Sequence, residues 1–110
     1  KMKLEKIIKD LNLRIISAGS DDIEIINGNI GDLLSEVMRT AKPDSAWITY
    51  QTHQNIVAVA EVVGIKAIII PYGLHYSEDT AEKAREHGIY LLESDETAFA
   101  VSGKLYGLIS

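Results

Sequence analysis

Residues 46–73 constrain the fold of this 110-residue chain more than any other stretch. Two short apolar runs, 46–50 and 66–70, are rich in Ile, Trp and Tyr and are bounded by turn residues. Strands buried on both faces of a sheet have this composition. The segment between them is long enough for a crossover helix that brings the chain back parallel. The stretch therefore predicts a right-handed βαβ unit whose strands end at the same edge of the sheet.

Polar and aromatic side chains follow both of these strands. Ligands of open α/β sheets bind beyond the carboxyl ends of the strands, so we expect a binding site at this edge. The candidate ligand-binding residues are Gln51, Thr52, His53, Asn55, Tyr72, Gly73, His75 and Thr97. Free N–H groups at the start of the helix that follows, with Thr52 and Asn55 as further donors, suit a phosphate or a carboxylate. Tyr50, Tyr72 and Tyr76 are either a stacking wall for a ligand or core and interface residues.

The helix expected at 54–63 is apolar around its whole axis, and Glu61 is its only charged residue. A sheet covers one face of such a helix, so the remaining faces need other helices of the chain or a second copy of it. We expect self-association, and the alternative is an intramolecular sandwich. The expected interface residues are Ile56, Val57, Val59, Ala60 and Val63. Gly64 is expected to end the helix.

The remaining segments complete an α/β pattern. Helices are expected at 3–11, 32–41 and 78–87, strands at 13–18, 22–27 and 89–92, and a break at Gly28, Asn29 and Gly31. Asp32 is expected to cap the second helix, and Ser77 and Gly88 are expected to bound the third. Ser94 or Asp95 is expected to cap a last amphipathic helix. The fold class is a three-layer-like α/β sandwich with a mainly parallel sheet of about five strands built from consecutive βαβ units.

Composition narrows the functional classes. The length fits one domain, 1–110. A net charge of −5 without a basic stripe argues against nucleic acid as a partner. Without cysteine the chain has no disulfide, thiolate nucleophile or cysteine metal site. No apolar run reaches the roughly 20 residues that cross a bilayer, and no signal-peptide core follows the charged start, so we expect a cytoplasmic protein and no membrane partner.

The succession GDLLSEVMRTAKPDSAWITYQTHQNIVAVAEVVGIKAIIIPYGL, followed by a helix and GIYLLESDETAF, resembles the DRTGG-domain family. The resemblance covers residues 30–109, and the same fold occurs as the N-terminal domain of the HPr kinase/phosphorylase. The family is named for Asp-Arg-Thr after one strand and Gly-Gly after the next. The matching positions here read Gln51-Thr52-His53 and Tyr72-Gly73, so only the second glycine is kept.

The resemblance implies a regulatory or dimerising module without a generally assigned catalytic role. Such domains stand alone or lie beside CBS and catalytic domains. Kinase activity is not implied, because the HPr kinase carries its catalytic machinery in another domain. This chain also has no G-x-x-x-x-G-K-[ST] phosphate loop.

Two functional hypotheses follow. The first is a non-enzymatic regulatory module, a homodimer that senses a small anionic metabolite or nucleotide at the strand-end cleft, with no cofactor and no catalytic residue. An adaptor for a catalytic partner protein is a variant of it. The alternative is a small metal-dependent enzyme using His53, His75 and Glu93, because two imidazoles and a carboxylate can bind zinc or iron. The spacing of these residues carries no local metal signature.

Overall fold

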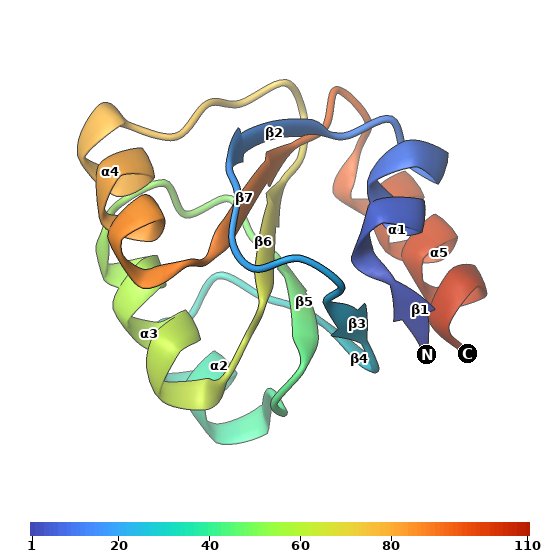
Figure 1. The fold of residues 1–110 in the computed structure, drawn as a ribbon, viewed down its shortest axis with the longest axis horizontal. Coiled ribbons are helices and arrows are strands. Elements are labelled where there is room, and N and C mark those ends of the chain that lie inside the picture. The colour runs from blue at the N-terminus through green and yellow to red at the C-terminus, as the bar shows by residue number, and fades with distance from the viewer.

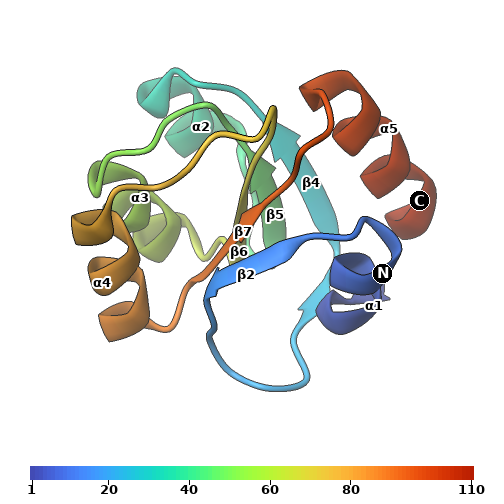
Figure 2. The same ribbon diagram turned by 90° about the horizontal axis from the view of Figure 1, so that it is seen from above.

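Helices cover both faces of a five-stranded sheet in the computed structural model, which describes residues 1–110 (Figure 1). The helices are α1 (Leu4–Asp10), α2 (Leu34–Thr40), α3 (Asn55–Val63), α4 (Glu78–His87) and α5 (Ala98–Ile109). The strands are β1 (Met2–Lys3), β2 (Arg14–Ser17), β3 (Glu24–Ile25), β4 (Asn27–Ile30), β5 (Ser45–Ile48), β6 (Ala67–Ile70) and β7 (Tyr90–Glu93). In Figures 1 and 2, α2, α3 and α4 lie on one face of the sheet, and α1 and α5 lie on the other.

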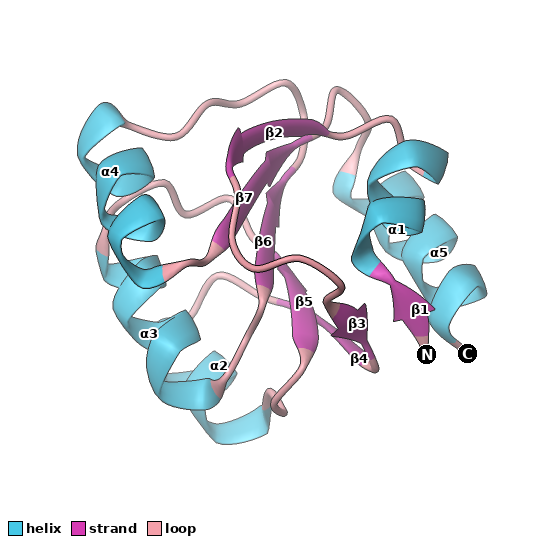
Figure 3. Ribbon diagram, in the orientation of Figure 1, coloured by secondary structure: helices cyan, strands magenta, loops and turns pink.

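The strand order is β2-β7-β6-β5-β4. Strands β4 to β7 are parallel to one another, whereas β2 pairs antiparallel with β7 at one edge (Figure 3). The short strands β1 and β3 form a separate antiparallel pair. Two consecutive βαβ units, β5-α3-β6 and β6-α4-β7, are present as expected. The predicted α/β sandwich with a mainly parallel sheet of about five strands is confirmed.

Strand β6 is buried on both faces and divides the core in two. Ala67 and Ile69 pack in a cluster with α1 and α5, whereas Ile68 packs in a second cluster with α3 and α4. Burial of one isoleucine side chain contributes about 1.5–3 kcal/mol. The neighbouring strand places Trp47 in the second cluster, where its indole N–H donates to the Gly31 carbonyl at 2.8 Å. The hydrophobic effect on both sides of β6 therefore requires both helix layers.

Several helix boundaries follow local chemistry as predicted. The hydroxyl of Ser77 accepts a hydrogen bond from the N–H of Thr80, and Gly88 ends α4 in the left-handed conformation. Gly64 ends α3 at φ +91°. The last helix is capped instead by Thr97, whose hydroxyl accepts from the N–H of Ala100. None of the five helices is both long enough and apolar enough to cross a membrane.

The region expected to be a break is a strand. Residues 27–30 pair in parallel with β5, in the register Asn27↔Ser45 to Ile30↔Ile48, whereas the expected strand at 22–27 is reduced to Glu24–Ile25. Gly28 and Asn29 disfavour strand locally, but the backbone pairing with β5 overrides that preference. A Cβ at Gly28 would lie 3.4 Å from Leu105 of α5, which is ordinary van der Waals contact, so the packing of α5 does not require a glycine there.

The regions predicted as helices at 32–41 and at the end of the chain leave large apolar side chains open to solvent. Leu33, Met38 and Tyr106 are all exposed. The reason is position, because α5 packs mainly on the edge strand β4, and the main helix neighbour of α2 is α3. Helices at the margin of a sheet lack neighbours on their outer side.

The predicted interface on α3 requires a correction. Ile56, Val57, Val59 and Ala60 are buried within the chain, where they pack against the sheet and lie between α2 and α4. These side chains therefore do not reach a second copy, and the intramolecular sandwich accounts for them. Val63 is half-buried. Val62, at 73% exposure, is the large exposed apolar side chain of this helix, and Ala58 is also exposed.

The conformation of Gly64 gives a matched pair of substitutions. Gly64→Ala should lower the free energy of unfolding by about 1–2 kcal/mol, because an L-residue at φ +91° is strained and its Cβ would lie 3.3 Å from Pro43. Gly103→Ala should raise it by about 0.5–1 kcal/mol, because that glycine lies in α5 with open space around it. Urea unfolding of both variants checks this. Equal effects of the two substitutions would contradict it.

Candidate functional site

The carboxyl ends of β4, β5, β6 and β7 meet at one edge of the sheet, because these four strands are parallel. We call this the strand-end edge. It carries Asp32 after β4, Tyr50 and Gln51 after β5, Tyr72 and Gly73 after β6, and Asp95 after β7. The antiparallel strand β2 begins here, so that Arg14 lies opposite Glu93. These side chains make up the candidate site that was expected at this edge.

A stacked pair of tyrosines lies at the centre of the strand-end edge. The ring centroids of Tyr50 and Tyr72 are 5.1 Å apart and the rings are inclined by 13°. Both side chains are partly exposed. A hydrogen bond to Tyr72, with partial desolvation and the nearby charges of Tyr72 and Asp32, raises the pKa of Tyr50 to about 12. The pair is a rigid aromatic surface open to solvent on part of its area.

The turn after β6 holds Tyr72 in a rarely adopted conformation. Tyr72 has φ +64° and Gly73 has φ +68°. Two backbone hydrogen bonds fix the turn, from the N–H of Tyr72 to Glu96 and from the N–H of Gly73 to Ser94, both at 2.8 Å. Left-handed backbone at a bulky residue costs on the order of 1–2 kcal/mol and occurs preferentially at functional sites.

Asp32 orders the loop after β5 instead of capping α2. Its carboxylate accepts hydrogen bonds from the hydroxyl of Thr49 at 2.8 Å and from the N–H of Tyr50 at 2.7 Å. Its carbonyl accepts from the amide of Gln51 at 2.9 Å. The N-cap of α2 is Leu33, and no side chain caps that helix. The capping prediction was wrong because these long-range donors take the carboxylate.

The start of α3 lies at the same edge. No acceptor in the chain bonds the backbone N–H groups of residues 52–55, and no side chain caps the helix. The Thr52 carbonyl accepts from the hydroxyl of Thr80, which ties this loop to α4. His53 and Asn55 are exposed. An adjacent shallow hollow is lined by Gln54, Asp79, Glu82, Lys83 and Glu86. Three carboxylates against one ammonium group disfavour a highly charged anion there.

The buried carboxylate of Glu93 lies at the β7 end of the strand-end edge. Glu93 is 3% exposed and contacts Nδ1 of His75 at 2.9 Å and the guanidinium of Arg14 at 3.5 Å. The N–H of Tyr76 also donates to it. Arg14 bonds the exposed Asp95 at 3.1 Å and, first by that hydrogen bond and then by its charge, lowers the pKa of Asp95. This network fixes the loop 74–76 onto β7.

The three residues of the metal-enzyme hypothesis are not gathered into one site. Glu93 contacts His75, but no group of three or more His, Asp or Glu side chains has the geometry to hold a metal ion. His53 lies exposed at the start of α3, in the loop that follows β5. The geometric premise of that alternative is therefore missing.

The structure brings together only part of the predicted ligand-binding set. Gln51, Tyr72, Gly73 and His75 lie in the loops that follow β5 and β6, Thr52, His53 and Asn55 lie at the start of α3, and Thr97 is the N-cap of α5. The sequence did not predict that Asp32 orders the loop after β5. It also did not predict that Arg14 lies at the strand-end edge. The sequence places Arg14 at the start of a strand. Because that strand pairs antiparallel with β7, its first residue lies at the strand-end edge, and the sequence alone does not reveal this pairing.

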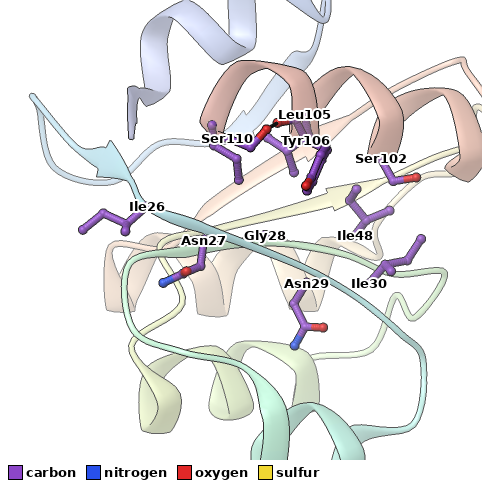
Figure 4. Close-up of a pocket in the computed structure, with 11 residues that line it drawn as sticks. Ile26, Asn27, Gly28, Asn29, Ile30, Ile48, Ser102, Leu105, Tyr106 and Ser110 are labelled. Carbon is purple, nitrogen blue, oxygen red and sulfur yellow. Dashed lines mark hydrogen bonds between the residues drawn. The ribbon is translucent and has the colours of Figure 1, made fainter.

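Two of the three principal cavities lie away from the strand-end edge. One of about 480 Å³ lies between β4 and α5 and is lined by Ile26, Gly28, Ile30, Ser102 and Tyr106 among others (Figure 4). Another lies near α1 and residues 21–23, and the third is the acidic hollow beside Gln54. The strand-end edge is therefore an open surface and not a deep pocket.

Comparisons with known proteins identify the fold. No family model matches the chain, and no curated protein matches it. Among solved structures, it is similar to the CBS and DRTGG domains of the regulatory region of Clostridium perfringens pyrophosphatase, complexed with the activator diadenosine tetraphosphate. The TM-score is 0.72 at 14% sequence identity, and the match covers 98% of this chain and 46% of that one. The chain has a DRTGG-like fold. It spans less than half the length of that regulatory region.

The positions that the resemblance aligns with the two halves of the name motif lie at one edge of the sheet. The positions that the resemblance aligns with the motif are 51–53, after β5, and 72–73, after β6. Strands β5 and β6 are adjacent and parallel, so both loops lie side by side at the strand-end edge. In this chain Tyr72 stands at the first glycine position and stacks on Tyr50.

The Glu93 network predicts a measurable contribution to stability. Glu93→Gln keeps the shape of the side chain but removes its charge, and should lower the free energy of unfolding by about 1–2 kcal/mol, because charge-assisted hydrogen bonds become neutral ones. Asp95→Asn is the control and should cost less, because Asp95 is exposed. Denaturant unfolding at pH 7 measures both. An unchanged or increased stability of Glu93→Gln would show that Arg14 and His75 do not stabilise this carboxylate.

Proposed function

We propose that the chain is a non-enzymatic regulatory module that binds a nucleotide at the strand-end edge and acts as a homodimer. The single observation that carries the ligand proposal is the stacked, partly exposed pair of Tyr50 and Tyr72. A nucleobase is a flat ring that stacks on such a surface, and stacking is worth about 1–3 kcal/mol for each base.

The surroundings of the pair favour a nucleotide over a small, highly charged anion. The unbonded N–H groups at the start of α3 can receive one phosphate. The acidic hollow beside Gln54 opposes a compact anion with several charges. A ligand that combines a neutral ring with a phosphate satisfies both features, because the ring supplies contact area and the phosphate meets the backbone N–H groups.

The fold comparison supports a regulatory role. The similar solved structure is a regulatory region complexed with a nucleotide activator, and its description names the activator for the CBS and DRTGG domains together. The strand-end edge of this chain has no cluster of His, Asp or Glu side chains that could hold a metal ion. In the adaptor form of this proposal, the module also contacts a catalytic partner protein through the strand-end edge.

A ligand screen tests the proposal. Nucleoside mono-, di- and triphosphates, diadenosine tetraphosphate, sugar phosphates and inorganic phosphate are each added to the purified chain, and the melting temperature is measured. Adenine or guanine nucleotides should raise it, because a ligand that binds only the folded state stabilises that state. Sugar phosphates and inorganic phosphate should have little effect. A response to none of the nucleotides would contradict the proposal.

Two variants locate the binding surface. Tyr72→Ala should weaken nucleotide affinity roughly tenfold or more in a calorimetric titration, because the stacking surface is lost. Val62→Ala is the matched control, since it removes an exposed apolar side chain from the far end of α3. Affinity of Tyr72→Ala equal to that of the control would place the ligand elsewhere.

A further inference from the structure

The two edges of the sheet differ in how they are protected. Strand β2 carries Arg14, has an irregular register between Ile15 and Ser17, and bonds only β7. Strand β4, at the opposite edge, has the sequence NGNI, regular register and no charged residue. Natural edge strands are usually blunted by charges, proline or bulges, because an open row of backbone groups pairs readily with another strand. The β4 edge has none of these devices.

The β4 edge is open along its outer side. In Figure 2, β4 runs between α2 and α5 and no other segment lies beyond it. Successive backbone groups of a parallel strand point alternately to either side. Since Gly31 donates to Ile48 of β5, the groups of Gly28 and Ile30 point away from the sheet. They are available to another strand.

An apolar surface surrounds this open edge. Ile26 and Ile30 flank Gly28 on the side facing α5, and Asn29 points to the opposite side (Figure 4). Ser102 and Tyr106 of α5 line the cavity with them, and Phe99 shares their helical stripe. We call the following five residues the edge patch: Ile26, Ile30, Leu33, Phe99 and Tyr106. Their exposed fractions lie between 49% and 88%.

The edge patch is large enough to matter for association. At roughly 180 Å² for a fully exposed side chain of this size, the five residues present on the order of 600 Å². Stable interfaces bury about 800 Å² on each partner, and the backbone of β4 and the margins of α2 and α5 supply the remainder. An apolar patch of this size on a monomer is often functional.

We propose that the β4 edge and the edge patch bind a second copy of this chain, with the two β4 strands antiparallel about a two-fold axis. This inference gives the dimer of the proposed function its surface and does not depend on the nucleotide. The arrangement makes one continuous ten-stranded sheet, in which α5 meets α5 and the Ile26 end of one strand meets the Ile30 end of the other. An isologous contact of this kind closes on itself.

The charge distribution is compatible with a second copy as the occupant. Each chain carries a net charge of −5, and an uncharged contact surface keeps like charges of two copies out of direct contact. The segment from Ile25 to Gly31 contains no charged residue, and neither does the edge patch. The patch also spans α5, β4 and the start of α2, which is broader than a single added peptide strand would cover. The same three elements of a second copy form a surface broad enough to cover the whole edge patch.

Light scattering coupled to size-exclusion chromatography tests the interface. The wild-type chain at about 100 μM should elute with twice its monomer mass of 12.1 kDa. Ile30→Lys and Ile26→Lys should each give a monomer at the same concentration, because a lysine on each copy places like charges near the two-fold axis and blunts the edge. Val62→Lys is the control, since it makes the same kind of change at an exposed site on α3 and should leave the dimer intact.

The outcomes separate this inference from its alternatives. Circular dichroism confirms that each lysine variant is folded, and if one variant unfolds, the other decides. A monomeric wild type, or a dimer that survives in the folded lysine variants, overturns the inference. Loss of the dimer in Val62→Lys alone would place the interface on α3. Nucleotide titration of the monomeric variants is a separate readout, so a dimer without a nucleotide response would contradict only the ligand proposal.

Discussion

The burial of β6 on both faces is the constraint on which the rest of the structure depends. Four consecutive residues, AIII, are removed from water by helices on either side. One layer of helices would leave half of this strand's side chains exposed, at a cost of several kcal/mol. The chain therefore crosses between strands through helices, and that topology brings the loops after β4 to β7 to one edge. The candidate site is a consequence of how the core is covered.

Covering β6 on both faces leaves the outer side of the edge strand β4 without a covering segment. Helix α5 covers β4 from one side only, and no segment of the chain follows the outer side of that strand. The strand-end edge and the β4 edge are also connected in the chain, because only Gly31 separates β4 from Asp32. The Asp32 carboxylate bonds the N–H of Tyr50, so the end of β4 is linked directly to the stacked tyrosines.

Elements whose structure depends on residues close together in the sequence were predicted well, and elements that depend on distant contacts were not. The strands β5 and β6, the end of α3 at Gly64 and both ends of α4 were predicted correctly, because apolar runs, a left-handed glycine and an N-cap serine act over a few residues. Strand β4 was missed, because its Gly and Asn residues are turn-formers and only the pairing with β5 makes it a strand. The exposure of Tyr106 likewise depends on the position of α5 at the margin.

The candidate site was predictable in place but not in detail. The rule that ligands bind at the carboxyl ends of parallel strands located Gln51, Tyr72 and Gly73. It could not show that Asp32 organises the loop after β5, that Tyr50 and Tyr72 stack, or that Arg14 enters from β2, because these are contacts between residues distant in sequence. The apolar character of α3 was recognised, but two flanking helices cover it and no second copy is needed.

Amide hydrogen exchange, measured residue by residue at low and high protein concentration, tests both the doubly covered strand β6 and the open β4 edge. The amides of Ile68 and Ile69 should exchange slowest at every concentration, because they lie in the doubly covered strand. The amides of Gly28 and Ile30 should exchange rapidly in dilute protein and slowly in concentrated protein. Protection of Gly28 and Ile30 equal to that of β6 in dilute protein, or rapid exchange of the β6 amides, would contradict these predictions.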